Sequence, residues 1–263
     1  LSSAASDVYK RQVSADLKNN KFTLKENSLS LNAITLNLDG WVAMLDNGAM
    51  DMDLKVNTPE INFKEILSLI PAIYQNNFDK LRTTGNMSLT AFAKGRMVGD
   101  TVPQFGLTLG VKDATFSYEG MPASVNGIQI AATVSNPGGV LDKTIIDLSD
   151  FRLNMAGNPF QATLYAATPI SDLNFKATAK GTVHLGKVKD IYPLGDSISL
   201  SGIVTADLQF AGRMSDIEKE NYQNIRGEGT LTVADMDLTM KGLPAVAVKK
   251  AQASVSAKAM SLS

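Results

Sequence analysis

Few side chains in this sequence are of a type that could do chemistry. His184 is the single histidine and cysteine is absent, so a zinc site would have almost no ligands to draw on. Carboxylates two residues apart occur at Asp51 and Asp53, and again at Asp235 and Asp237. Such pairs could serve acid–base catalysis or bind calcium.

The surroundings of these residues favour a structural role. Each aspartate pair alternates with methionine and leucine, and His184 alternates with Val183 and Leu185, so all of them are expected on the solvated face of strands. Neither Asp113 nor the Asp150-Phe151-Arg152 segment has a nucleophile nearby. No phosphate-binding glycine loop, nucleophile elbow or metal-binding helix motif occurs. We therefore expect a protein that is not an enzyme, with no cofactor and no metal site.

The composition excludes several other classes. With 263 residues, 44% of them hydrophobic, the chain can bury a core, and a net charge of −1 provides no electrostatic footprint for nucleic acid. No apolar run reaches the 18 residues of a membrane-spanning helix. Aromatic residues make up only 6%, which argues against stacking on sugars or bases. The 11 methionines suit ordinary core packing and, with less weight, a surface for variable apolar ligands.

Apolar residues recur at every second position through most of the chain. Successive side chains of a strand point to opposite faces of its sheet, so each such segment has one apolar and one polar face. This pattern is typical of antiparallel strands with one solvated face. The clearest segments are 50–56, 87–91, 105–111, 151–155, 160–164, 173–177, 204–210 and 236–240.

Helical spacing interrupts this alternation. Apolar residues from Phe63 to Phe78 recur at intervals of three and four, which predicts a helix near 62–81 that Pro71 should kink. A shorter version precedes Pro193, at Val188, Ile191 and Tyr192. Residues 214–225 are expected to form either one or two helical turns, with Ser215 and Glu218 as a capping box, or a polar loop.

The chain contains one pattern twice. Residues 85–97 and 202–214 each hold two glycines with an alternating segment between them, and both end in Gly-Arg-Met. Asn37-Leu38-Asp39-Gly40 matches Asn154-Met155-Ala156-Gly157 upstream, and Gly120-Met121-Pro122 matches Gly242-Leu243-Pro244 downstream. Matching positions lie roughly 120 residues apart, a period that indicates an elongated, stacked architecture.

These observations predict a division of the chain. Residues 28–137 form a first β repeat with the helix near 62–81, 138–144 a link, and 145–260 a second β repeat, while 13–27 end a preceding repeat. Residues 1–12 are read as translated sequencing adaptor, because their codons can match the end of a common transposase adaptor, and they are left out of the fold. The protein is expected to begin upstream and to continue past Ser263, so that any membrane anchor would be missing here.

The paired glycine-bounded strands, the short helices ending near Ile70-Pro71 and Tyr192-Pro193, and the Gly-Arg-Met exits resemble the AsmA family. The stretch Leu200-Ser-Gly-Ile-Val-Thr-Ala-Asp-Leu-Gln-Phe-Ala-Gly212 is most similar to its C-terminal region in Bacteroidetes-type sequences. The resemblance covers nearly everything after residue 20. It implies a non-enzymatic envelope protein, anchored in the inner membrane and projecting into the periplasm, with a long curved β-groove. Such proteins are implicated in outer-membrane assembly and phospholipid movement.

The expected fold class is therefore mainly β: an elongated, curved antiparallel sheet built from two repeats, with one or two short helices packed on it. The expected partners are phospholipid acyl chains, and membranes through the missing anchor. The alternatives are a periplasmic scaffold for outer-membrane protein assembly or for protein targeting to the membrane, whose apolar face would be self-packed, and a secreted β-rich adhesin. The residues expected to line the groove are Met52, Leu54, Leu89, Leu107, Leu109, Leu153, Leu208, Phe210, Leu238 and Met240.

Overall fold

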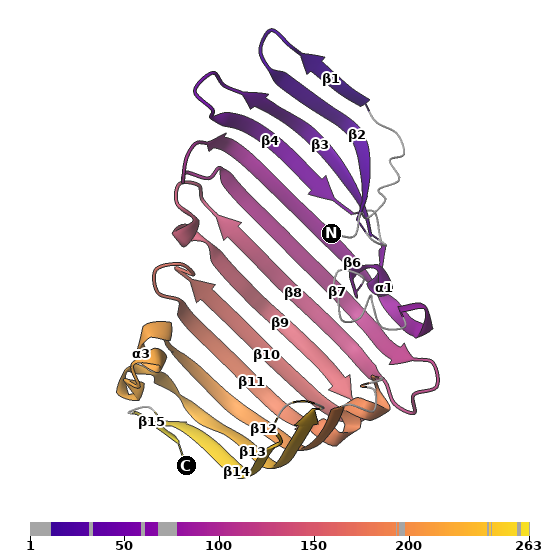
Figure 1. The fold of residues 1–263 in the computed structure, drawn as a ribbon, viewed down its shortest axis with the longest axis vertical. Coiled ribbons are helices and arrows are strands. Elements are labelled where there is room, and N and C mark those ends of the chain that lie inside the picture. Colours follow the sequence, from indigo (N-terminus) through magenta and orange to yellow (C-terminus); the bar gives the residue numbers. More distant parts are fainter. Residues whose placement is uncertain are drawn as a thin grey trace.

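A single open antiparallel sheet of 15 strands forms most of the molecule (Figure 1). The computed structural model describes residues 12–31, 34–58, 61–67, 78–192, 194, 198–240, 242, 244–256 and 259–262. The strands follow one another in chain order, each hydrogen-bonded to the next, and only the short β5 stands outside this order, beside β6. The prediction of a mainly β, curved antiparallel sheet is confirmed.

Most strands are longer than the alternating segments that predicted them, because the extended backbone continues beyond each segment at both ends. The first half of the sheet contains β1 (Gln12–Asp16), β2 (Lys21–Leu31), β3 (Ile34–Met44), β4 (Met50–Asn57), β5 (Ile61–Asn62), β6 (Leu81–Met97), β7 (Gln104–Tyr118) and β8 (Val125–Asn136). The second half contains β9 (Ile145–Met155), β10 (Asn158–Ala167), β11 (Asn174–His184), β12 (Ile198–Arg213), β13 (Arg226–Met240), β14 (Val246–Ser256) and β15 (Ala259–Leu262).

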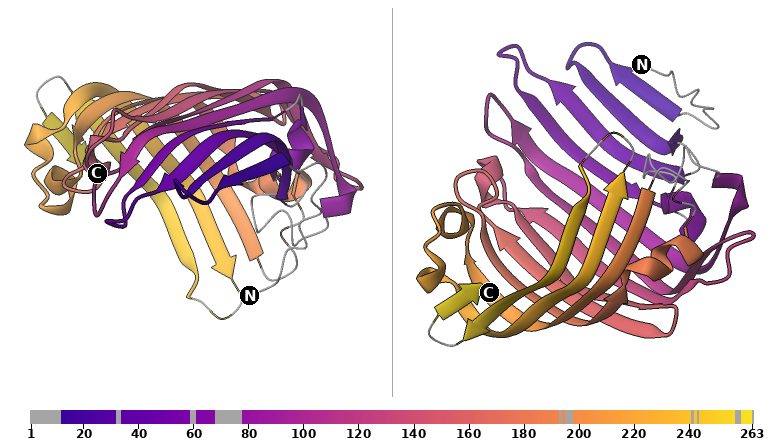
Figure 2. Two further views of the ribbon diagram at one scale, coloured as in Figure 1. Left: turned by 90° about the horizontal axis from the view of Figure 1, so that it is seen from above. Right: turned by 60° about the horizontal axis from the view of Figure 1, so that its bottom comes forward.

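The sheet curves around one of its faces. Figure 2 shows β12 to β14 turning under the arch formed by the middle strands, with helix α1 (Phe63–Leu67) on the same concave side. We call this the inner face. The right-handed twist of strands and their β-bulges both produce such curvature.

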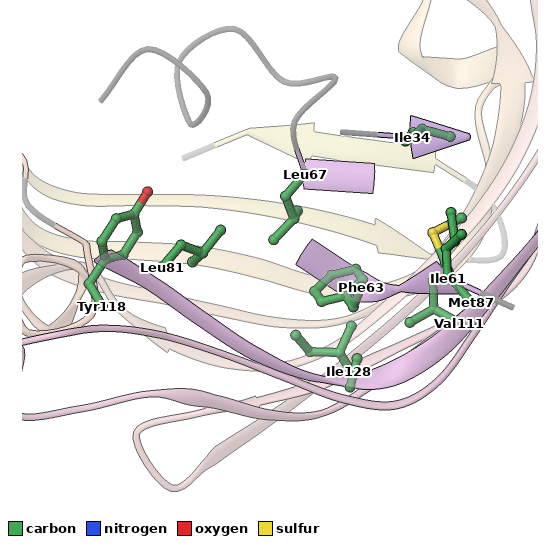
Figure 3. Packing of buried hydrophobic residues seen from close by; sticks show 10 residues of the cluster. Ile34, Ile61, Phe63, Leu67, Leu81, Met87, Val111, Tyr118 and Ile128 are labelled. Carbon is green, nitrogen blue, oxygen red and sulfur yellow. The ribbon is translucent and has the colours of Figure 1, made fainter. Parts of the chain in front are cut away.

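The main hydrophobic core lies where α1 packs on the inner face of β6 and β7. Phe63 and Leu67 of the helix are buried together with Met87, Val111 and Ile128 of the strands. Figure 3 shows Phe63 directed toward Ile128, with Leu67 on the same side of the sheet. The helix therefore covers one corner of the inner face, where β6 begins and β7 ends.

The predicted helix over 62–81 is confirmed only for Phe63–Leu67. Residues 68–77, with Pro71, lie outside the described residues, as does the side chain of Ile66. The prediction is wrong at its end, because Phe78–Lys80 is a 3-10 turn and Leu81 already pairs with Tyr118 as the first residue of β6. Pairing with a strand far along the chain outweighs the local helical spacing there.

The other two helical expectations have different outcomes. The segment before Tyr192 is a 3-10 helix, η3 (Leu185–Asp190), and the segment after β12 is a helix, α3 (Met214–Glu218), rather than a polar loop. The capping box at Ser215 and Glu218 is wrong, because Ser215 lies inside the helix. Asp172, from the β10–β11 connection, supplies the cap: its carboxylate accepts hydrogen bonds from the Ser215 backbone N–H at 3.1 Å and hydroxyl at 2.8 Å.

The two glycine motifs occupy strands, and both contain the same bulge. Gly85 in β6 and Gly202 in β12 have φ of 94° and 113°. Each sits at a register shift opposite an aspartate with positive φ, Asp113 (48°) and Asp235 (47°) respectively. The second motif leaves its strand at Met214, which begins α3. The two motifs share a strand and a bulge, and that residues 28–137 and 145–260 form equivalent repeats stays a prediction.

One matched pair of segments in the proposed repeat is wrong. Asn37 to Gly40 lies in the middle of β3, whereas Ala156 and Gly157 form the turn between β9 and β10. The similarity of these two short segments is local in sequence and is not accompanied by the same backbone conformation.

We expect Gly85→Ala to destabilise the protein by about 1–3 kcal/mol, because the new Cβ adds strain at positive φ and a clash. An added Cβ would lie 2.4 Å from the Ala114 Cα. Gly120→Ala is the matched control, since Gly120 also has positive φ (84°) but has nothing within 4 Å of an added Cβ. Urea denaturation should show a larger loss for Gly85→Ala, and equal losses would contradict the close approach at the bulge.

Candidate functional site

Three ladders of facing apolar residues cross the inner face, one residue from each successive strand. Cross-strand neighbours on one face of a sheet lie in contact, so each ladder forms a continuous apolar strip. The first ladder is Leu38, Val56, Ala91, Leu107, Val134, Ile146, Ala166 and Phe175. The second is Leu89, Leu109, Ala132, Leu148, Leu164, Ala177 and Phe210, and the third is Met87, Val111, Ile130, Phe151, Ala162, Ala179 and Leu208.

The inner face is covered at two corners. The α1 core closes the first corner. At the second, diagonally opposite, the side chain of Ile225 is buried over Gly212, where an added Cβ would lie 2.4 Å from its Cδ1. Phe175 and Phe210 meet edge to face beside it, with ring centroids 5.5 Å apart.

Between these corners three side chains of the first two ladders are exposed. Leu107, Ile146 and Leu164, from β7, β9 and β10, keep 37%, 36% and 37% of their surface exposed. They lie within the first two ladders and are flanked only by other uncharged residues of the same ladders. Around these three residues the inner face thus has an accessible apolar surface, carried by a hydrogen-bonded sheet.

All ten residues predicted to line the groove lie on strands at inner-face positions. Nine are half-buried and Leu107 is exposed. Leu89, Leu109 and Leu153 pack against the α1 core. Phe210, in the second ladder, belongs to the Ile225 corner. Leu208 lies two residues before it on β12, in the third ladder. The remaining four, Met52 and Leu54 on β4 and Leu238 and Met240 on β13, lie toward the two ends of the sheet.

Sequence reasoning missed the residues at the centre of the open surface. Val134, Ile146 and Leu164 were not among the candidates. Leu164 belongs to a recognised alternating segment, so its position on the inner face could have been read from the sequence. Nothing in the local sequence distinguishes an exposed inner-face residue from a covered one, because the covering elements come from distant parts of the chain.

The outer face of the sheet carries the carboxylates considered at the outset. Arg96 donates to both carboxylate oxygens of Asp51, at 2.7 and 2.8 Å, and this hydrogen bonding lowers the pKa of Asp51. Lys94 lies 3.0 Å from Asp53. Asp235 and Asp237 are exposed. These contacts agree with the predicted solvated strand face.

His184 is the last residue of β11 and is half-buried. Within the part of the chain that the structure describes, no three His, Cys, Asp or Glu side chains are grouped so that they could hold a metal ion. Among those same residues no helix has the length and apolar character needed to cross a membrane.

Comparison with known proteins returns no match to a family profile, a curated protein or a solved structure. The resemblance to the AsmA family accordingly remains an expectation that rests on the residues quoted for it.

Proposed function

We propose that this chain binds phospholipid acyl chains on its inner face and conducts phospholipid between the inner and outer membranes. In this proposal it is a non-enzymatic envelope protein of AsmA type that serves outer-membrane biogenesis. It lies in the periplasm, and the full-length protein is held to the inner membrane by an anchor. The location rests on the family resemblance alone, whereas acyl-chain binding also has support from the geometry of the sheet.

The observation that carries the proposal is an apolar surface left uncovered on a structured frame. Monomeric proteins rarely expose contiguous apolar patches unless a partner or ligand covers them. Leu107, Ile146 and Leu164 are connected by ladders that contain no charged or hydrogen-bonding side chain. The occupant that suits such a surface is long, flexible and apolar, and it needs no fixed polar anchor.

The dimensions and energies fit an acyl chain. At about 4.8 Å per strand, a ladder from β3 to β11 is roughly 35 Å long, and since the roughly 30 Å hydrocarbon core of a bilayer contains two acyl chains end to end, the ladder is long enough for a single acyl chain. Each CH2 group removed from water contributes about 0.8 kcal/mol. An open face covers an acyl chain on one side only, so each CH2 group contributes less than this to the free energy of binding. Lipid can therefore bind along the ladder and dissociate again.

The direct test is lipid extraction and native mass spectrometry of the purified chain. We expect phospholipid to co-purify, and the chain to accelerate transfer of a fluorescent phospholipid between two vesicle populations. A chain that purifies without lipid and leaves the transfer rate unchanged contradicts the proposal.

The alternative, a scaffold for outer-membrane protein assembly or targeting, predicts a different result. If the inner face were covered by protein, the purified chain would be free of lipid and would capture unfolded outer-membrane protein instead. The exposure of Leu107, Ile146 and Leu164 favours lipid binding over a self-packed face. No observation on the described residues favours an adhesin.

A further inference from the structure

One rim of the sheet carries a row of exposed hydrophobic side chains. Six connections whose residues the structure describes lie at this rim, because the antiparallel pairing brings the β1–β2, β3–β4, β6–β7, β8–β9, β10–β11 and β12–β13 turns to the same side (Figure 1). Each of the six has at least one large exposed apolar residue in it or directly beside it. One from each, in chain order, gives Leu17, Met44, Val98, Val140, Ile170 and Met214.

Several of these residues are more than half exposed. Leu17 is 78%, Ile170 67% and Met44 52% exposed. A single exposed aliphatic residue on a protein surface is normal, but one at each of six described turns along a rim is a pattern. We call this row the hydrophobic rim.

The opposite rim lacks the pattern at most of its described connections. In residues 119–124, 156–157 and 185–192 no large apolar side chain is exposed, whereas Val246, directly after the β13–β14 connection, is 47% exposed. Met121 and Tyr192 instead pack against the α1 core, and the Tyr192 ring lies 5.3 Å from that of Tyr118. Because the two rims differ, the mere presence of turns does not explain why apolar residues are exposed along the first rim.

The spacing of the hydrophobic rim fits a bilayer better than a protein partner. Neighbouring turns on one rim are two strands apart, about 10 Å, so the exposed residues are separate points along a line. A protein partner needs a contiguous surface of about 800 Å² on each side. An acyl phase is continuous, and each side chain can enter it independently of the others.

Charges at these turns are nearly balanced. Exposed acidic residues at the turns include Asp46, Asp100, Glu218 and Glu220, and exposed basic residues include Lys18, Lys143 and Lys219. Attraction to an anionic surface therefore supplies little of the binding, and a zwitterionic phospholipid surface suffices.

We infer that the hydrophobic rim docks this protein on a phospholipid bilayer by inserting its turn residues into the membrane interface. The uncovered ladder residues Leu107, Ile146 and Leu164 lie close to this same rim, since β7 and β9 begin there and β10 ends there. A sheet docked in this way presents its open inner face next to the lipid. Docking itself does not require that the inner face carry acyl chains.

The test is co-flotation of the purified chain with phosphatidylcholine vesicles. The rim variant combines Met44→Ser, Val140→Ser and Ile170→Ser, and it should bind at least about tenfold less than the unmodified chain. The control variant combines Leu29→Ser, Ile203→Ser and Val246→Ser, which are 42%, 37% and 47% exposed and lie on the half of their strands nearer the opposite rim, and it should bind normally. Because all six positions are exposed, both variants should keep the native circular dichroism spectrum.

Three flotation results would overturn the inference. The unmodified chain could stay unbound, the rim variant could float as well as the unmodified chain, or the control variant could lose as much binding as the rim variant. Binding that required anionic lipid and disappeared near 1 M salt, where the Debye length is about 3 Å, would also contradict hydrophobic insertion.

The absence of cysteine allows a second, independent measurement. Ile170→Cys and Val246→Cys, each labelled with an environment-sensitive dye, should differ on addition of vesicles. A blue shift is expected at position 170 and none at 246, and equal shifts would refute rim insertion. Leu107→Asp should still float, so failure of acyl-chain binding and failure of docking can be told apart.

Discussion

Combined replacement of Leu107 and Leu164 by aspartate is expected to remove at least about nine-tenths of the phospholipid that co-purifies with the chain. Each carboxylate would stand in the middle of an uncovered apolar ladder, where a bound acyl chain would bury it without a partner. Burying an unpaired charge costs several kcal/mol, and 1.4 kcal/mol already changes an equilibrium constant tenfold. Lipid extraction and the vesicle transfer assay measure the effect.

This variant should remain folded, because Leu107 and Leu164 are more than a third exposed and the new charges reach water in the lipid-free protein. Thr108→Asp combined with Tyr165→Asp is the matched control, since it places the same charges on exposed outer-face positions next to Leu107 and Leu164. A folded Leu107→Asp, Leu164→Asp protein with unchanged lipid content would rule out acyl-chain binding at this surface. Unfolding of the variant, but not of the control, would instead indicate a self-packed face.

Truncation of Phe63 to alanine is expected to lower the free energy of unfolding by about 3–5 kcal/mol, the range for a buried aromatic residue. Phe63 is 6% exposed, and its ring packs against the inner face near Ile128 (Figure 3). The loss combines the transfer of the ring to water with the cavity that remains under α1. Urea denaturation with detection by circular dichroism measures it.

Lys64→Ala is the control for this prediction, because it alters the next residue of the same five-residue helix and removes no buried ring. It should change stability by less than about 1 kcal/mol. Equal losses of unfolding free energy for Phe63→Ala and Lys64→Ala would show that the packing of Phe63 does not stabilise the protein. They would contradict the assignment of α1 as the cover of that corner of the inner face.

The faces of the strands could be predicted from the sequence, because alternation is a property of the extended backbone itself. All ten lining candidates, from Met52 to Met240, lie on the inner face for this reason, and the aspartate pairs lie on the outer face with Arg96 and Lys94. Two-residue periodicity needs no knowledge of which strands pair.

The ends of helices and their caps could not be predicted in this way. Helical spacing continued to Phe78, yet Leu81 pairs with Tyr118, which is distant in the chain. The cap of α3 comes from Asp172 and not from the local Ser215 and Glu218 pair. The local sequence indicates which secondary structure a segment favours. Contacts with distant parts of the chain decide which one it adopts.

The sequence by itself determined a one-sided antiparallel β protein and the residues of its apolar face. Only the tertiary structure decided which part of that face is open. Ile225 and Phe63 cover opposite corners and leave Leu107 and Ile146 exposed, and the chain order of the strands collects Leu17, Ile170 and their equivalents along one rim. Exposure is a property of the assembled sheet, because it depends on elements that are far apart in the chain and meet only when every strand is paired.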